Sequence, residues 1–530
     1  MKVMNRTETL ELLIVVNVAA TLGAVFYAHK PFGGFFTAIS IAFINNSIVH
    51  SAGNLLLYSS IDTSTISGDQ IYMYIVHALS GLPFDTMQRL PVNHVLIAMS
   101  LFALARRLTI TRPTRSAMSI AATVSIIFLL NTAYEVGNMS FFVKGAGTIF
   151  YLLFVLLLLR YSVAREKATL TAILILFVAN SFFDYTAQVW MIVSVVPFVF
   201  LGTSKGENVR GVGLLNILIL MAVVFLAYRS IVYTAYVPWM TQVLISSSIQ
   251  SFVHTLPFFQ NVSAYPFQGD RPFALPVFIA NVLTFAITVV VTGHYLLRVL
   301  WMKARGQNLT REDLVFLCLF LPIPLTVAIY LPIGHFNLSY AVLVLPLLAA
   351  YCVWVLTKRN LNSSSTQGQR TVSAKIGALL PVLLALLLVL GIGSYIGALE
   401  SGTLLVSSNS EMDQGANWLF GHTDGKISIL SDLDSLGKLL IARSSFLGGS
   451  FDNLSLRYYD PQSYAGLVNG NSASSLTYVV VDARTSIPVS SVEWQFFQPL
   501  SRHISEIGSN PNVSQIYDDG TCLIEVWHPP

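Results

Sequence analysis

Apolar runs recur through most of the first 400 positions of this 530-residue chain. Many of these runs are close in length to the roughly 20 residues that a helix needs to cross a bilayer. This pattern limits the possible folds more than any other feature. Only 11% of the residues are charged, whereas soluble globular domains carry roughly 25%. The sequence therefore predicts a polytopic α-helical membrane protein.

We expect about eleven transmembrane helices, all within residues 1–399. Their approximate ranges are 10–29, 92–105, 117–133, 143–160, 168–184, 188–202, 211–228, 274–297, 313–332, 339–356 and 376–398. Several of these ranges are short for a full crossing, which leaves open that a pair is re-entrant or buried. Two long loops, at 30–91 and 233–272, are rich in aromatic residues, and the first begins with a predicted interfacial helix at 32–49.

The basic residues are distributed unevenly along the chain. With the N-terminus inside, nineteen of the 30 Lys and Arg residues fall in the inner segments. Only five fall in the outer loops, namely Lys30, Arg89, Lys144, Arg229 and Arg271. Because short loops rich in Lys and Arg stay on the cytoplasmic side, the sequence predicts an N-in, C-out topology.

Residues 400–530 have a different composition, in which apolar residues alternate with polar ones. The alternation predicts strands at Ile427–Leu430 and Thr477–Val481. Asp518-Asp519-Gly520 is typical of a tight hairpin turn. Helices are expected at 412–420, 432–442 and 499–508. We expect an extracytoplasmic α/β domain here, joined to the transmembrane domain of residues 1–399.

The stretch Ser67–Pro83 in the first outer loop holds the strongest candidate for chemistry, Asp69. Residues 70–82 following it predict an amphipathic helix. Its apolar side would consist of Tyr72, Ile75, Val76 and Leu79. Asp69 would then cap the helix N-terminus, or act as a reactive carboxylate at the membrane face. Both interpretations remain open from the residues alone.

Other polar residues lie in loops that the topology places on the same outer side. They are Asp62, His77, Glu135, Asp184, Asp270 and His335. Acids are expected in outer loops, so each is also explained as a solvated loop residue. Converging on one face, they would form a polar site at the bilayer surface.

Three basic residues on the predicted outer side, Lys144, Arg229 and Arg271, have two interpretations. Each would extend its charge from an apolar stem into the interface, or would bind a phosphate there. The sequence contains no P-loop, dinucleotide fingerprint or zinc signature. The net charge of +4 is small and gives no reason to expect nucleic acid binding.

The pattern as a whole resembles the GT-C class of membrane glycosyltransferases, which includes protein O-mannosyltransferases and aminoarabinose transferases. Ser67–Pro83 is similar to the family's first-loop stretch, where acids precede a Tyr-containing helix that ends in a small residue and Pro. The family usually has two adjacent acids, whereas this chain has Asp69-Gln70. Glu135 matches a second acid of the next outer loop, and 334–346 resembles a turn leading into a Pro-containing span.

The absence of a disulfide framework and of retention signals suggests a prokaryotic cell membrane, and the resemblance implies an enzyme there. It would transfer a sugar from a polyprenyl-phosphate donor to a protein, glycan or lipid acceptor on the outer face. Asp69 would be the general base, and Glu135 would assist it or bind a divalent cation, Mg²⁺ or Mn²⁺. Lys144, Arg229 or Arg271 would stabilise the leaving phosphate. The remaining substrate-binding positions would be Asp62, Tyr72, His77, Asp184, Asp270 and His335.

Two other classes of function remain open. A transporter or polymerase of lipid-linked glycans would handle the same lipids, but transporters carry ionisable residues near the middle of their spans. The predicted spans here have ionisable residues mainly near their ends. A non-catalytic membrane scaffold, with an outer domain that binds a partner, would need no reactive carboxylate at Asp69.

Overall fold

The protein is described here from a computed structural model. It describes residues 6–29, 75–76, 78–82, 90–109, 115–131, 143–181, 183, 185–201, 208–232, 275–325, 339–363, 367–400, 410–423, 427–431, 439, 454–458, 477–482, 509, 511–520 and 522–527.

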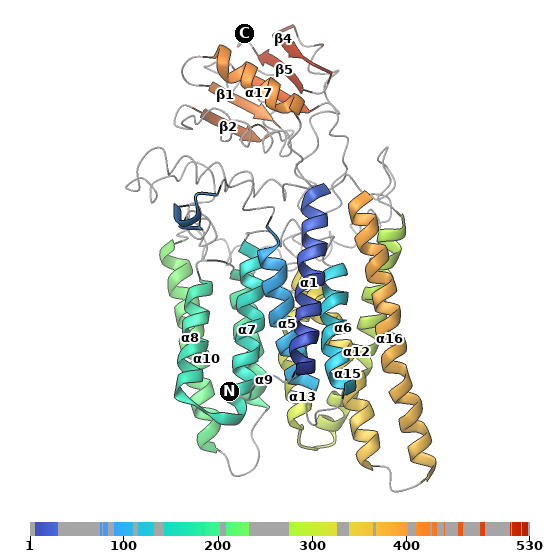
Figure 1. Ribbon diagram of the computed structural model, residues 1–530. Helices are drawn as coiled ribbons and strands as arrows, with labels where there is room; N and C mark the ends of the chain where they lie inside the picture. The colour runs from blue at the N-terminus through green and yellow to red at the C-terminus, as the bar shows by residue number, and fades with distance from the viewer. Residues whose placement is uncertain are drawn as a thin grey trace.

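The apolar runs form helices that pack side by side in one bundle (Figure 1). The helices are α1 (Arg6–His29), α5 (Val92–Thr109), α6 (Arg115–Asn131), α7 (Val143–Ala164), α8 (Lys167–Asn180), α9 (Tyr185–Phe200), α10 (Asn208–Val232), α12 (Leu275–Ala304), α13 (Arg311–Phe320), α15 (Ser339–Ser363) and α16 (Gln367–Glu400). Each expected span overlaps one of them. In the described ranges, four helices are long and apolar enough to cross a membrane, with shorter apolar helices beside them. The number of crossings stays a prediction.

The two ends of the bundle differ. The C-terminal domain lies at the end where α1 and α16 finish, which we call the tail end (Figure 1). The opposite end, where α1 begins, is called the far end. The Lys and Arg side chains that the structure describes in the bundle all lie toward the far end, at positions 106, 107, 160, 165, 167, 298, 303, 305 and 311. This agrees with the uneven charge distribution of the sequence, while the side that faces the cytoplasm stays a prediction.

Large apolar side chains occupy both the interior and the outer surface of the bundle. Trp190 and Tyr151 are fully buried and meet edge to face, with their ring centroids 5.4 Å apart. Val290 of α12 and Val389 of α16 are 69% and 65% exposed. Water would disfavour so many exposed apolar side chains, so the outer surface suits contact with lipid tails.

A buried carboxylate joins α12 to α13 near the far end. Asp313 is fully buried, and the hydroxyl of Tyr295 donates to its Oδ1 at 2.8 Å. The backbone N–H and the hydroxyl of Thr310 donate to its Oδ2 at 2.9 and 2.7 Å, which completes a capping box at the start of α13. Because each oxygen has a donor, the burial of this charge is compensated.

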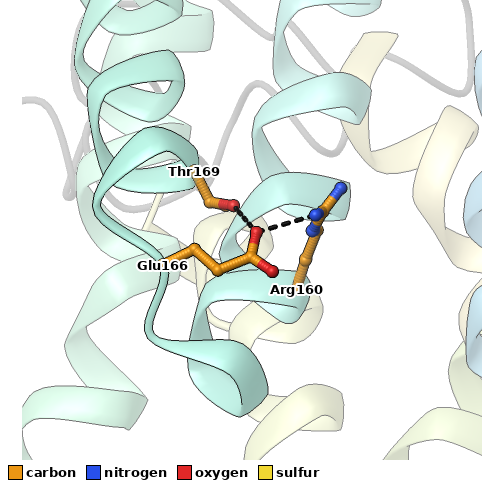
Figure 2. Close-up of polar contacts among 3 residues, drawn as sticks. All are labelled: Arg160, Glu166 and Thr169. Atoms are coloured by element: carbon orange, nitrogen blue, oxygen red, sulfur yellow. Dashed lines mark hydrogen bonds and ion pairs between the residues drawn. The ribbon is translucent and has the colours of Figure 1, made fainter. Parts of the chain in front are cut away.

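The turn between α7 and α8 is held by a second carboxylate (Figure 2). Thr169 donates to Oε2 of Glu166 at 3.0 Å, and Arg160 donates to the same oxygen at 2.7 Å. These two donors lower the pKa of Glu166, the Thr169 hydroxyl having the larger effect. Arg165 takes a left-handed backbone conformation, φ 54°, which reverses the chain between the helices.

The C-terminal domain contains a five-stranded mixed sheet with the strand order β2-β1-β3-β5-β4. The strands are β1 (Ile427–Ser431), β2 (Leu454–Tyr458), β3 (Thr477–Asp482), β4 (Val513–Asp518) and β5 (Cys522–Trp527). β1 pairs in parallel with β2 and β3, whereas β5 is antiparallel to β3 and β4. The predicted strands and the hairpin are confirmed, with Gly520 in the turn at φ 83°.

Helix α17 (Ser410–His422) covers one face of this sheet and confirms the helix expected at 412–420. Trp418 packs against Tyr517, with ring centroids 5.3 Å apart. At Gly415 an added Cβ would lie 2.3 Å from Sγ of Cys522, so the close approach requires glycine. Most of the helices expected at 432–442 and 499–508 lies outside the described residues.

We predict that Tyr295→Phe destabilises the bundle, because Oδ1 of the buried Asp313 loses its donor. The expected cost is on the order of 1–3 kcal/mol, measured as a lowered thermal midpoint of the detergent-purified protein. Tyr161→Phe is the matched control, since Tyr161 is buried and its ring contacts Arg165. Equal midpoints for both variants would contradict the role of the Tyr295 hydrogen bond.

We also predict a pH-dependent effect of Glu525→Gln in the sheet. Glu525 is 2% exposed, and burial raises its pKa above the usual 4.5. Because the pKa of Glu525 is higher in the folded state than in the unfolded state, the free energy of unfolding falls as the pH rises toward neutral. At a pH low enough to protonate the carboxyl group in both states, this loss of stability is absent. The variant should raise the thermal midpoint of the detergent-purified protein at pH 7.5 and match the wild type near pH 3, where both states are protonated. A lower midpoint for the variant than for the wild type at pH 7.5 would contradict this.

Candidate functional site

The helix bounds locate two of the candidate residues at the tail end of the bundle. Lys144 is the second residue of α7, and Arg229 lies in the last turn of α10. The other candidates lie outside the described residues: Asp62, Asp69, Tyr72, His77, Glu135, Asp184, Asp270, Arg271 and His335. Whether these side chains meet in one site therefore stays a prediction.

The described part of the first-loop stretch confirms a helix and its end. Residues 75–76 and 78–80 are helical, and Gly81 follows at φ 67°, the conformation that commonly ends a helix. The Ser80 hydroxyl donates to the Val76 carbonyl at 2.6 Å and accepts from the Leu82 N–H at 3.2 Å. Ile75 and Leu79 are 48% and 84% exposed. Exposed apolar side chains on a short helix suit a position in the membrane interface.

Buried polar side chains fix the turn between α8 and α9, which contains position 184. Gln188 is fully buried, and its amide N–H groups donate to the Phe177 carbonyl at 3.3 Å and to the Ser181 hydroxyl. Phe183 packs against Phe150 of α7, with ring centroids 5.1 Å apart. The turn is therefore anchored on both sides of position 184.

A second buried group joins α1 to α5 near the tail end. His94 is 3% exposed, and it lies beside Gly23 of α1. An added Cβ at position 23 would lie 2.5 Å from Cβ of Pro91 and 3.4 Å from Cγ of His94. Tyr395 of α16 donates to the Leu22 carbonyl at 2.6 Å. Close packing thus joins α1 to α5, and one hydrogen bond joins it to α16.

Neither Gln188 nor His94 is among the residues expected from the sequence to form the site. A usable signal was present, because a polar side chain within an apolar run must find a partner inside the protein. Gln188 follows the candidate Asp184 by one helical turn, and His94 comes three residues after Pro91, where a span begins. Their partners, however, come from other turns or other helices.

Gln188 and His94 are buried side chains that help to fix helix ends at the tail end of the bundle. The candidate carboxylates lie in chain segments that adjoin helix ends on this side. Within the described residues, no three His, Cys, Asp or Glu side chains gather where they could hold a metal ion. A divalent cation therefore remains a prediction that concerns the other segments.

No protein-family model and no curated protein matches the sequence. Among solved structures, the chain is similar to two crystal structures of ArnT from Cupriavidus metallidurans. The structure bound to undecaprenyl phosphate is 12% identical to this chain, with a TM-score of 0.44, and the alignment covers 97% of each chain. The apo structure is 13% identical to this chain, with a TM-score of 0.42, and its alignment also covers 97% of each chain. ArnT is an aminoarabinose transferase of the GT-C class.

We predict that Gly23→Ala loosens the contact between α1 and α5. The added methyl group would overlap Pro91, and overpacking costs about 1–3 kcal/mol, partly offset by about 1 kcal/mol of helix propensity. Gly293→Ala in α12 is the control, because nothing lies within 4 Å of its added Cβ. The thermal midpoint in detergent should fall for Gly23→Ala alone. A Gly23→Ala protein as stable as Gly293→Ala would refute the close contact.

Proposed function

We propose that the protein is a membrane glycosyltransferase that takes a sugar from a polyprenyl-phosphate donor and transfers it to an acceptor at the tail end of the bundle. The tail end would face the outside of the cell. The acceptor would be a protein, a glycan or a lipid. The reaction that the family resemblance implies would thus take place at the tail end of the bundle.

The observation that carries the proposal is the contrast between the two ends of the bundle. Apart from Lys144 and Arg229, the cations of the described helices lie toward the far end. Two carboxylates there, Glu8 and Glu166, pair with Arg106 and Arg160. The helix ends that flank the candidate acids lie at the tail end, beside the C-terminal domain. A lipid-linked donor presents its phosphate at the membrane surface. A reactive carboxylate at a helix end therefore suits this substrate better than one inside the bundle.

Asp69 would remove the proton from the acceptor hydroxyl as that oxygen attacks the anomeric carbon of the sugar. The bond between this carbon and the phosphate oxygen breaks, and the polyprenyl phosphate leaves with the electron pair. Lys144 or Arg229 would stabilise the negative charge that develops on the phosphate. Both belong to helix termini at the tail end. Glu135 would assist Asp69 or bind a divalent cation.

The exposed apolar side chains of Ile75 and Leu79 have a role in this proposal. Ile75 and Leu79 belong to the same stretch as Asp69, six and ten residues after it. A helix embedded in the interface would place that carboxylate at the depth of a lipid phosphate. The lipid tail would remain in the bilayer during transfer.

We predict that Asp69→Asn abolishes sugar transfer by the purified protein from a panel of polyprenyl-phosphate sugars. Loss of a general base lowers the rate by about 10²–10⁴-fold. Asp85→Asn, in the same loop, is the matched control and should keep wild-type activity. Size-exclusion profiles and thermal midpoints would establish that both variants fold.

The alternatives give different results in the same assay. No transfer from any donor by the folded wild type would contradict the glycosyltransferase and favour a scaffold or a transporter. Equal transfer by the wild type and Asp69→Asn would support a glycosyltransferase in which Glu135, and not Asp69, is the general base. Glu135→Gln would then be the inactive variant.

A further inference from the structure

The sheet of the C-terminal domain has one face covered by α17 and a second face with an unusual polar row. Residues paired across neighbouring strands lie on the same face of a sheet. Ser428 of β1 pairs with Thr477 of β3, which pairs with Trp527 of β5. Glu525 lies two residues before Trp527 and so shares its face. We call Ser428, Thr477, Glu525 and Trp527 the polar row.

The polar row lies on the face opposite α17. Helix α17 approaches β5 at Cys522 and β4 at Tyr517, and Tyr517 pairs with Ile524. Cys522 and Ile524 alternate with Leu523 and Glu525 along β5, so they point to the other face. The row is therefore separate from the packing that holds α17.

Three side chains of the polar row bury polar atoms that have no hydrogen-bond partner among the residues that the structure describes. Ser428, Glu525 and Trp527 are 7%, 2% and 3% exposed. The atoms are Oγ of Ser428, Oε2 of Glu525 and Nε1 of Trp527, which are three of the six such atoms in the described ranges. Most buried polar atoms in folded proteins are paired. Three exceptions on one face therefore point to a ligand that pairs with them.

The chemistry of the three atoms selects the kind of ligand. The indole N–H of Trp527 only donates, an ionised Glu525 only accepts, and the Ser428 hydroxyl does both. An anion would be repelled by Glu525, and an ammonium group offers no acceptor to Trp527. A hydroxyl group accepts from the indole and donates to the carboxylate. Neighbouring hydroxyls on a sugar ring supply this combination several times.

The position of the row suits a ligand of that size. Ser428 and Trp527 are two strands apart, which corresponds to roughly 10 Å. Thr477 is the first residue of β3, Trp527 is the last of β5, and Ser428 is the second of β1. The row thus lies at one end of three neighbouring strands.

We propose that the polar row binds a neutral saccharide through hydrogen bonds to Glu525, Trp527 and Ser428. This inference rests on the proposed function for the role of that sugar, which would be part of the acceptor. Binding itself requires no transfer. The raised pKa of Glu525 is consistent with a site whose ligand, rather than the fold, compensates the buried carboxyl. Binding sites often reduce stability in this way.

The test measures saccharide binding to the full-length protein in nanodiscs by saturation-transfer NMR. The probes are the methyl glycosides of glucose, galactose and mannose and the disaccharide maltose. Trp527→Phe removes the indole N–H but keeps a ring, Glu525→Gln keeps the shape, and Ser428→Ala is the smallest change. Tyr517→Phe on the opposite face is the control. Each row variant should weaken binding about tenfold or more, whereas the control should not change it.

Several outcomes would overturn the proposal. These are no binding of any probe to the wild type, binding unaffected by all three row variants, or equal loss in Tyr517→Phe. Slow labelling of Cys522 establishes that the sheet of each variant is folded, and Ser428→Ala serves if Trp527→Phe does not fold. Asp69→Asn separates the two proposals, because it should bind saccharide like the wild type even though it transfers none. Saccharide binding without transfer by the wild type would support this inference and contradict the proposed function.

Discussion

Hydrocarbon offers no hydrogen-bond partner to a peptide group, and the rest of this structure depends on that constraint. Each crossing segment must satisfy its backbone within its own helix. Side chains then determine only which face packs inward and which meets lipid. Trp190 and Tyr151 fill the interior, while Val290 and Val389 point outward. Ionisable groups are consequently confined largely to the ends of the helices, and the two ends acquire different chemistry.

At the far end, two ion pairs and a buried carboxylate serve the fold. Glu166 binds Arg160 across the α7–α8 turn, and Asp313 receives hydrogen bonds from Tyr295 of α12 and from Thr310, the residue before α13. At the tail end, Gln188 and His94 are buried and help to fix the ends of helices. In the proposed function this division leaves the carboxylates of the adjoining outer loops for substrate. The polar row of the C-terminal sheet would bind part of the acceptor.

Much of the fold was predictable because its signals are local. Apolar runs located the helices, and alternation located β1, β3 and the hairpin at Gly520. β2 was missed because its five residues include Arg457 and form a strand only by pairing with β1. The site was less predictable. Gln188 acts through Phe177 and His94 lies against Gly23, and neither partner follows from local sequence. Whether Asp69 approaches Glu135 depends on how the outer loops pack, and both residues lie outside the described ranges.

The central claim is that a polyprenyl phosphate binds at the tail end of the bundle. Photo-crosslinking tests it most directly, using a polyprenyl phosphate with a photoreactive group beside the phosphate, followed by mass spectrometry of the labelled peptides. The account predicts labels in residues 30–91 and around Lys144 and Arg229, reduced by excess unlabelled lipid. Labels around Arg160 and Arg311 at the far end, or labels spread evenly over the lipid-facing helices and unaffected by competitor, would contradict it.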